Sequence, residues 1–461
     1  MGDHGRLAGA LGVLVFAAVG LTARGDLAAP GPYPPGWRTV TVTRPNSSTF
    51  SARLFYPAVT AGQNAAFDPA GGPYPAISFG HGFLQAVSQY QSTCQHLATH
   101  GYLVIASESE GGLFPNHQNF ANDLRHCLTW LEQRQVDPAS FLFGSVDVNR
   151  FGMSGHSMGG GASILATAAD ARVKTLANLA AADTNPSAIS AMAGVSVPFA
   201  LLAGSQDTIT PLGQHQQPMY NNGRAPRQLA VIVGGFHCGF TDASFIGCDT
   251  GSISRATQLA IVRRLLTAWF HLHLKGLQDG WQAVWGPAAT SDGGVLRTID
   301  SGVGLSPAVG TAAGAIGETV SVNVAITNSG PSASDFALFA DGDWPAVVSP
   351  GTTGIVPSAG SAVVVVSVTV PAGPPLESRS ILISARRELD GGTRGYATIS
   401  VSRLRVADID ADGAVSAADV SLFVEVLLGL ETDPARVFRS DVNQDGVVDG
   451  DDVQVFVAAV V

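Results

Sequence analysis

The fold of this chain is decided by residues 151–168, which read FGMSGHSMGGGASILATA. Residues 151–154 are typical of a short buried strand and residues 162–168 of a helix, so the chain must turn sharply between them. A serine at such a turn takes strained backbone angles, which only small flanking residues allow. Gly155 and Gly159 flank Ser157. The pattern therefore predicts an exposed, nucleophilic Ser157 hydroxyl at the end of a strand.

A serine hydroxyl becomes a useful nucleophile only beside a base, and the base needs an acid that fixes its tautomer. Residues 197–204 predict a strand, and Asp207 lies on the loop that leaves it. Residues 229–233 predict the next strand, which ends at His237. The order Ser, Asp, His along the chain is that of the α/β-hydrolase fold. We therefore expect Ser157, Asp207 and His237 to form a catalytic triad.

Two other acids stay open as alternatives for the third member of this triad. Asp183 follows the apolar residues 176–179, and Asp242 lies beyond the histidine. Neither has both the strand-end context and the chain order of Asp207.

The remaining histidines, including His271 and His273 on the helical run 258–274, are expected to pack or to face solvent.

A tetrahedral intermediate of acyl transfer needs two backbone N–H donors aimed at its oxygen. Residues 74–79 predict a strand that runs into Gly80-His81-Gly82-Phe83, which resembles the oxyanion loop of lipases. The two donors would be the N–H groups of Phe83 and of Met158, the residue after the serine. We expect His81 to hydrogen-bond the backbone rather than to transfer protons.

The motif GHSMGG at residues 155–160, the run DTITPLGQHQQPMYN at residues 207–221 and His237 resemble bacterial cutinase-like polyester hydrolases, within the wider dienelactone-hydrolase-like α/β-hydrolases. The resemblance covers about residues 36–275. It implies a carboxylic ester substrate, including polymeric esters, no cofactor for catalysis, and substrate contacts from Phe83 and His156. The family usually has a tryptophan on a loop where residues 177–183 of this chain read ANLAAAD, without an aromatic side chain.

The N-terminus predicts export. His4 and Arg6 precede the apolar residues 7–21, and small residues follow at 23–25. This is typical of a signal peptide over residues 1–25, because the apolar stretch is shorter than the ~20 residues needed to span a bilayer. The alternatives are a membrane anchor or an N-terminal core helix. No other segment predicts a membrane span, so we expect a secreted, extracellular protein.

The four cysteines are Cys94, Cys127, Cys238 and Cys248. An even number in an exported protein permits disulfides, and four cysteines allow three pairings. We favour Cys238 with Cys248, because this short link would staple the loop of His237, and Cys94 with Cys127 as the second pair. No CxxC spacing predicts a zinc site.

Nearly all of the net charge of −11 belongs to the C-terminal residues 406–461, which hold twelve acidic residues and two arginines. The rest of the chain is close to neutral, so nothing predicts nucleic-acid binding.

The acidic residues of the C-terminal part form two copies of one twelve-residue pattern, at residues 408–419 and 441–452, each followed by an apolar helical run. Oxygens at positions 1, 3, 5, 9 and 12, with a carbonyl at position 7, are typical of a calcium loop. The expected ligands are Asp408, Asp410, Asp412, Ala414, Ser416 and Asp419, then Asp441, Asn443, Asp445, Val447, Asp449 and Asp452.

With one helix predicted after each loop, the last 56 residues resemble a type I dockerin module. The resemblance implies two Ca²⁺ ions, calcium-dependent folding, and a cohesin partner on a scaffold or cell surface. The alternative is a small calcium-clamped module with another partner or with none.

Between these parts, residues 320–326 alternate apolar and polar side chains, and further strand candidates follow at 336–339, 362–370, 381–385 and 396–401. Alternation of this kind predicts half-buried strands. About 100 residues of this pattern predict an immunoglobulin-like sandwich that serves as a spacer.

The sequence thus predicts a signal peptide (1–25), an α/β-hydrolase catalytic domain (26–300), an immunoglobulin-like sandwich (301–403) and a small α-helical dockerin-like module (404–461). The expected function is a secreted serine esterase that acts through an acyl-enzyme. The alternatives are a lipase or small-ester hydrolase of the dienelactone type, and a non-catalytic scaffold-binding protein with a degenerate hydrolase domain.

Overall fold

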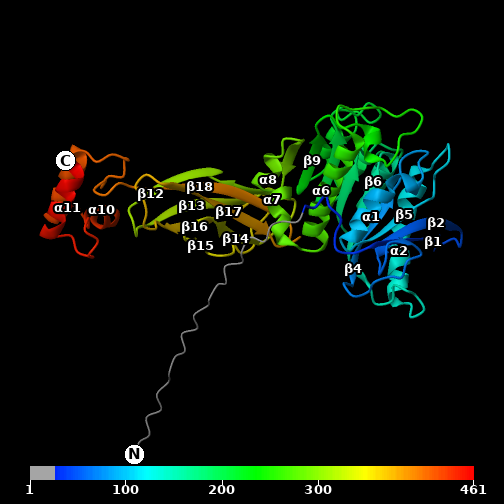
Figure 1. The fold of residues 1–461 in the computed structure, drawn as a ribbon, viewed down its shortest axis with the longest axis horizontal. Helices are drawn as coiled ribbons and strands as arrows, with labels where there is room; N and C mark the ends of the chain where they lie inside the picture. Colours follow the sequence, from blue (N-terminus) through cyan, green and yellow to red (C-terminus); the bar gives the residue numbers. More distant parts are fainter. Residues whose placement is uncertain (1–25) are drawn as a thin grey trace, which may run out of the picture.

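The computed structural model describes residues 26–461, so the predicted signal peptide lies outside the described residues. The chain forms three parts that follow one another end to end in Figure 1. A mixed α/β part extends to β10, two small β-sheets come next, and a group of short helices ends the chain. Across residues 26–461, no helix combines the length and the apolar character needed to cross a membrane.

The first part is built on a ten-stranded sheet with the order β10-β9-β8-β7-β6-β4-β5-β2-β1-β3. The strands are β1 (Pro35–Thr43), β2 (Thr49–Pro57), β3 (Gly62–Gln63), β4 (Tyr74–Gly80), β5 (Leu103–Ser107), β6 (Val146–His156), β7 (Val173–Leu179), β8 (Phe199–Gly204), β9 (Arg227–Ile232) and β10 (Val295–Asp300).

The six central strands, β5, β4, β6, β7, β8 and β9, run parallel, whereas β2 and β10 flank them antiparallel. Parallel strands are covered by helices on both faces and therefore read as continuous apolar runs. β4 and β5 are buried at every position. The predicted strands at 74–79, 151–154, 197–204 and 229–233 correspond to β4, β6, β8 and β9. Their carboxyl ends all meet at one edge of the sheet, where ligands bind in open α/β sheets.

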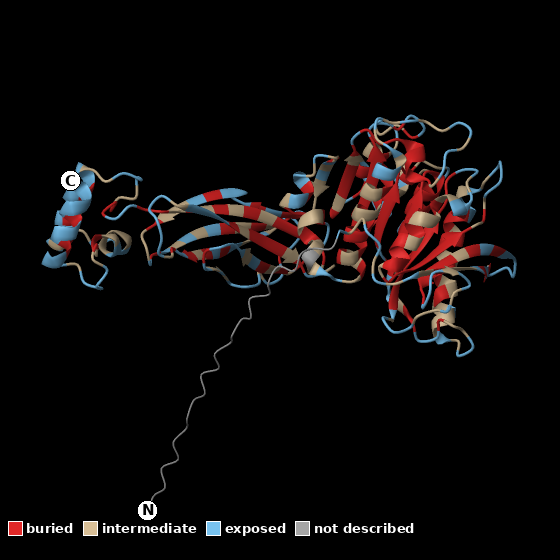
Figure 2. Cartoon of the chain, viewed as in Figure 1, coloured by how far each residue is buried: buried red, intermediate tan, exposed pale blue. Residues whose placement is uncertain are grey.

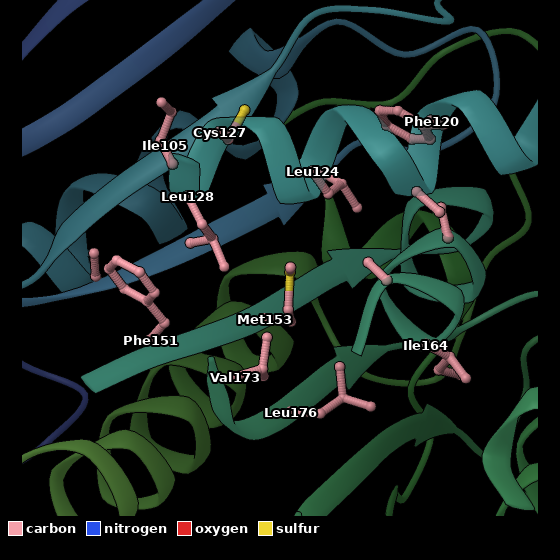
Figure 3. Packing of buried hydrophobic residues seen from close by; sticks show 14 of the residues in the cluster. Ile105, Phe120, Leu124, Cys127, Leu128, Phe151, Met153, Ile164, Val173 and Leu176 are labelled. Atoms are coloured by element: carbon pink, nitrogen blue, oxygen red, sulfur yellow. The ribbon is translucent and has the colours of Figure 1, made fainter. Parts of the chain in front are cut away.

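Helices cover the two faces of this sheet. They are α1 (Gln91–Thr99), α2 (His117–Val136), α3 (Met158–Ala168), α4 (Ala188–Ala191), α5 (Gln216–Asn222), α6 (Arg255–Leu274), α7 (Trp281–Val284) and α8 (Pro287–Thr290), with 3₁₀ turns η1 (Val87–Tyr90), η2 (Met192–Gly194), η3 (His237–Phe240) and η4 (Gln278–Gly280). One core lies under α2 and α3, and the other under α1 and α6. Figure 3 shows the first of these, with side chains of α2 above Phe151 and Met153 of β6. In Figure 2 most of the length of the central strands is coloured as buried.

These two cores decide the cysteine pairing. Cys94 on α1 lies in the core of one face, and Cys127 on α2 lies in the core of the other, so the sheet separates them. Both are free and buried, and burial raises the pKa of each thiol. The expected pair of Cys94 with Cys127 is therefore wrong. Cys238 and Cys248 form a disulfide, as predicted.

The second part holds two four-stranded sheets, with orders β11-β13-β16-β15 and β12-β18-β17-β14. The strands are β11 (Val303–Ser306), β12 (Val309–Gly314), β13 (Thr319–Asn328), β14 (Phe336–Asp341), β15 (Ala346–Ser349), β16 (Ser361–Thr369), β17 (Ser378–Arg387) and β18 (Arg394–Arg403). Alternate side chains of both sheets point into one shared core, for example Val364 and Val366 from β16 and Ile381 and Ile383 from β17. The period-two pattern read from the sequence has this cause.

The C-terminal part contains α9 (Ala417–Leu427), α10 (Pro434–Ser440) and α11 (Gly450–Val460). α9 and α11 each begin with a capping box, and Phe423 stacks on Phe456 with ring centroids 4.1 Å apart. α10 was not predicted. Its start carries the signal that could have found it, because Asp433 caps the helix and Pro434 occupies its first turn.

Polar contacts join the three parts. Arg394 of β18 lies over the ring of Trp281 and donates to Gln278 Oε1 at 2.9 Å, which links the second part to the first. Arg439 of α10 pairs with Glu318 at 3.0 Å, which links the third part to the second. Both arginines are at least partly buried, so solvent screens these contacts less than exposed pairs.

Candidate functional site

Ser157 lies between β6 and α3 with φ 55° and ψ −121°, a left-handed conformation that non-glycine residues rarely adopt. A Cβ atom on Gly155 would lie 2.4 Å from the carbonyl oxygen of Gly159, and one on Gly159 would lie 2.2 Å from that of Gly80. Both contacts are far too short, so only glycine fits at either position. The turn therefore holds Ser157 at the carboxyl edge of the sheet.

Asp207 follows β8 and His237 follows β9, the neighbouring parallel strand. Asp207 Oδ2 lies 2.8 Å from His237 Nδ1, and both side chains are almost fully buried. The N–H groups of Ile209 and Thr210 donate to Asp207 Oδ1 at 2.9 and 2.7 Å. These two bonds fix the direction of the Asp207 carboxylate. The imidazole thus has an oriented partner at one ring nitrogen.

Thr210 was not singled out from the sequence. Its hydroxyl lies 2.9 Å from Asp207 Oδ2 and 3.0 Å from His237 Nδ1, and it donates to Ala180 O at 3.2 Å. It therefore ties the acid and the base to the loop after β7. The only sequence feature that could have indicated this role is a residue with a hydroxyl group three positions after Asp207.

His156, expected to contact the substrate, lies in the interior next to the ring of His237. It is 1% exposed, and its ring packs against that of His237 at a tilt of 44°, with centroids 4.4 Å apart. Its Nδ1 lies 2.9 Å from Tyr90 Oη, and Tyr90 Oη accepts from the N–H of Gly82 at 3.0 Å. His156 is therefore buried next to His237, and the substrate contact expected of it stays a prediction. Burial, and then the neighbouring His237, hold the pKa of His156 well below its ordinary value, so its ring stays neutral.

The loop that carries Phe83 packs against the first turn of α3. The close approach of Gly159 to Gly80 brings the two segments together. Neither Phe83 N–H nor Met158 N–H donates a hydrogen bond to any group in residues 26–461. Both donors are therefore free for a ligand. His81 lies 2.8 Å from Gly82 O and 2.9 Å from Ser109 O, the backbone-bonding role expected for it.

The alternative acids lie elsewhere. Asp183 accepts from Ser187 Oγ at 2.9 Å and from Ile189 N–H at 3.0 Å, and Asp242 accepts from Ser92 N–H at 2.9 Å. Neither carboxylate contacts His237. Only Asp207 among the three acids is paired with the histidine.

Exposed apolar side chains surround this edge of the sheet. The loop 108–116 is tied by Ser109 O to His81 and by the neighbouring His117 to the N–H of Asn185 at 3.0 Å, so it runs between the loops 80–84 and 180–187. Phe114, on this loop, is 95% exposed. The other exposed apolar side chains on loops of this edge are Phe83, Leu84, Leu113, Ile209 and Ile246. These six residues lie on loops at the carboxyl edge of the sheet, the edge at which Ser157 also lies, and we call them the apolar rim.

The predicted calcium ligands gather at two similar loops. One carboxylate oxygen from each of Asp408, Asp410 and Asp412 lies within 4.8 Å of the others. Asp408 Oδ1 is buried with no hydrogen-bond partner in the described structure, and burial raises the pKa of Asp408. A buried, unpartnered carboxylate oxygen beside two more carboxylates fits a hard cation such as Ca²⁺.

The second loop repeats the local bonding of the first. Asp419 Oδ1 accepts from Ile409 N–H at 2.7 Å, and Asp452 Oδ1 accepts from Val442 N–H at the same distance. The same two loops carry the remaining predicted ligands, which are Ala414 and Ser416 on the first and Asp441, Asn443, Asp445, Val447 and Asp449 on the second. The two loops therefore have the same form.

Comparisons with known proteins match two separate segments of the chain. Residues 26–255 match the family described as PET hydrolase-like, and residues 406–459 match the dockerin type I domain. Cutinase est1 of Thermobifida alba is 27% identical over 149 residues, which cover 32% of this chain and 48% of that protein. A cutinase of Thermobifida fusca is 25% identical over 231 residues, 47% of this chain and 72% of that protein. The chain spans about half the length of the first curated relatives it matches. Residues 26–255 are therefore similar to PET hydrolase-like proteins and to cutinases, and residues 406–459 are similar to dockerin type I domains.

Proposed function

We propose that this chain is a serine ester hydrolase with Ser157 as nucleophile, His237 as base and Asp207 as the acid that orients it. The observation that carries the proposal is the 2.8 Å contact of Asp207 with His237 at the same sheet edge as the strained Ser157. The cutinases that resemble this chain support the reaction class.

In the proposed mechanism, His237 takes the proton of Ser157 Oγ while that oxygen attacks the ester carbonyl. The free N–H groups of Phe83 and Met158 hold the oxyanion. His237 then gives its proton to the leaving alcohol, and a water activated by His237 releases the acyl group. Asp207 orients His237 throughout, because backbone hydrogen bonds hold its carboxylate in place. No step needs a cofactor.

The substrate class follows from the apolar rim. Six exposed apolar side chains would lose contact with water if an apolar ester chain lay across the site, and each contributes about 1.5–3 kcal/mol when fully buried. We infer that the substrate is an ester on a water-insoluble chain, with polyester as the first choice. Lipids and small soluble esters are the alternatives.

The other parts of the chain indicate where the protein acts and what it binds. The N-terminal signal and the disulfide between Cys238 and Cys248 support an extracellular protein. The dockerin loops are proposed to hold two Ca²⁺ ions and to present α9 and α11 to a cohesin on a scaffold or cell surface. The two β-sheets between them are inferred to be an immunoglobulin-like spacer.

The test is hydrolysis of p-nitrophenyl esters, from acetate to long chains, by the full chain and by Ser157→Ala. Loss of turnover in a folded variant is the expected result. Ser190→Ala, which removes an exposed hydroxyl on α4, is the matched control and should keep full activity. Retained turnover in Ser157→Ala would remove the serine mechanism, and no turnover in the wild type would favour a non-catalytic binding protein.

A further inference from the structure

The loop 241–254 joins η3 to α6 and runs back past the residues that carry the proposed base. The carboxylate of Asp249, on this loop, accepts three backbone hydrogen bonds. Resting on the proposed function, we propose that Asp249 is a positioning residue that fixes the loops of His237 and Asp207 relative to each other.

The three bonds come from both loops. Asp249 Oδ2 accepts from His237 N–H at 2.9 Å and from Thr208 N–H at 3.2 Å, and Oδ1 accepts from Cys238 N–H at 3.0 Å. Thr208 directly follows the proposed acid. One carboxylate therefore binds the backbone beside Asp207 and the backbone of the base itself. Hydrogen bonds to an ionised acceptor are stronger than neutral ones.

The disulfide holds Asp249 in place. Cys248, the residue before Asp249, is bonded to Cys238, the residue after His237. This link closes a ring of about ten residues and limits the positions that the Asp249 carboxylate can reach. Ser252 N–H, further along the same loop, donates to Gln206 Oε1 at 2.7 Å. The loop is thus fixed to the base side by a covalent bond and to the acid side by hydrogen bonds.

Asp249 touches neither the His237 ring nor the Asp207 carboxylate, so its effect on the reaction passes through the backbone. Misplacement of a catalytic group by about 1 Å costs about 10²-fold in rate. Loss of Asp249 should therefore lower kcat and leave KM nearly unchanged, because the carboxylate does not contact the substrate.

The experiment compares Asp249→Ala and Asp249→Asn with wild type in the full chain, using p-nitrophenyl butyrate below the unfolding temperature. We expect kcat to fall about 10- to 100-fold in Asp249→Ala, with KM within about twofold. Asp249→Asn should lose less, because the amide oxygen can keep the bonds to His237 and Thr208. The rate of Ser157 labelling by a p-nitrophenyl phosphonate should fall in parallel with kcat.

Asp242→Ala is the matched control. It removes a carboxylate from the same loop, one that bonds Ser92 instead of the base or acid loops. It should keep the wild-type kcat. The double variant Cys238→Ala/Cys248→Ala should reduce the cost of removing Asp249, because a released loop no longer holds the carboxylate in place.

Wild-type kcat and labelling rate in a folded Asp249→Ala protein would overturn the proposal. So would a lower melting temperature with unchanged kcat, because that is a purely structural role. If Asp249→Ala does not fold, Asp249→Asn must still lower kcat and the labelling rate, because its amide nitrogen cannot accept from Cys238 N–H, and wild-type values in this variant would overturn the proposal. Failure of the proposed function would be visible separately, as turnover that survives in Ser157→Ala.

Discussion

Asp207 Oδ2 lies 2.8 Å from His237 Nδ1, although the two residues are 30 positions apart in the chain. β8 and β9 are adjacent and parallel, so the loops that leave them begin at the same edge. The pairing register, Gly204 opposite Ile232, sets the two loop starts level with each other. This register is the reason that an acid three residues after one strand meets a histidine five residues after the next.

Replacing the acid should remove the orientation of the base without removing the nucleophile. We expect Asp207→Asn to lower kcat by about 10²- to 10⁴-fold, because an amide that donates to His237 Nδ1 stabilises the wrong tautomer. The measurement is steady-state hydrolysis of p-nitrophenyl butyrate. Asp183→Asn, which changes the alternative acid after β7, should keep activity close to wild type; the reverse order of effects would reassign the acid.

Histidine burial predicts a pH dependence of stability. Burial lowers the pKa of His273 from 6.5 to about 4. As pH falls, the unfolded chain therefore binds a proton at this position first. The contribution of neutral His273 to the free energy of unfolding is complete above pH 6.5. It is lost as pH falls from 6.5 to 4, at about 1.4 kcal/mol per pH unit. The free energy of unfolding can be measured by urea unfolding at several pH values. Between pH 4 and 6.5 it should fall less steeply with decreasing pH in His273→Leu than in wild type, and an equal pH dependence would contradict the prediction.

Calcium removal should affect only the C-terminal part. Without the cation, the carboxylates of Asp408, Asp410 and Asp412 repel one another, so chelation should unfold residues 404–461. Limited proteolysis and circular dichroism would detect the loss, while ester turnover should stay within about twofold. Asp412→Ala should weaken calcium binding and Asp451→Ala, an acid outside the predicted ligand set, should not. Equal loss of turnover and of the helices would mean that calcium also supports the catalytic part.

The apolar rim should matter for insoluble substrates more than for soluble ones. We expect Phe114→Ala to lower adsorption to polyester particles and their hydrolysis several-fold, with p-nitrophenyl acetate turnover near wild type. Phe143→Ala is the control, because Phe143 is an exposed phenylalanine ahead of β6, at the opposite end of that strand from Ser157. Equal effects of the two substitutions on particle hydrolysis would rule out a specific role for the rim.

Local patterns predicted many of the strands and helices of this protein and placed the candidate residues Ser157, Asp207 and His237 after the ends of strands. The apolar runs before Ser157, Asp207 and His237 predict parallel strands, because both faces of such strands are buried. The two acidic repeats predict their own loops, because the spacing of oxygen ligands is a local property. The helix α10 was missed although its signal, Asp433 before Pro434, was also local.

Contacts between distant segments could be decided only by the tertiary structure. The sequence could not place Cys94 and Cys127 on opposite faces of the sheet, since that depends on which crossover covers which face. It could not show that His156 is buried behind His237, because burial is set by Tyr90 and by loops far along the chain. Asp249 carries no motif at all, and its three hydrogen bonds exist only because the folded chain brings β8, β9 and the loop 241–254 together. Residue types and spacings predicted which groups react or bind, whereas their mutual geometry came from packing across the sheet.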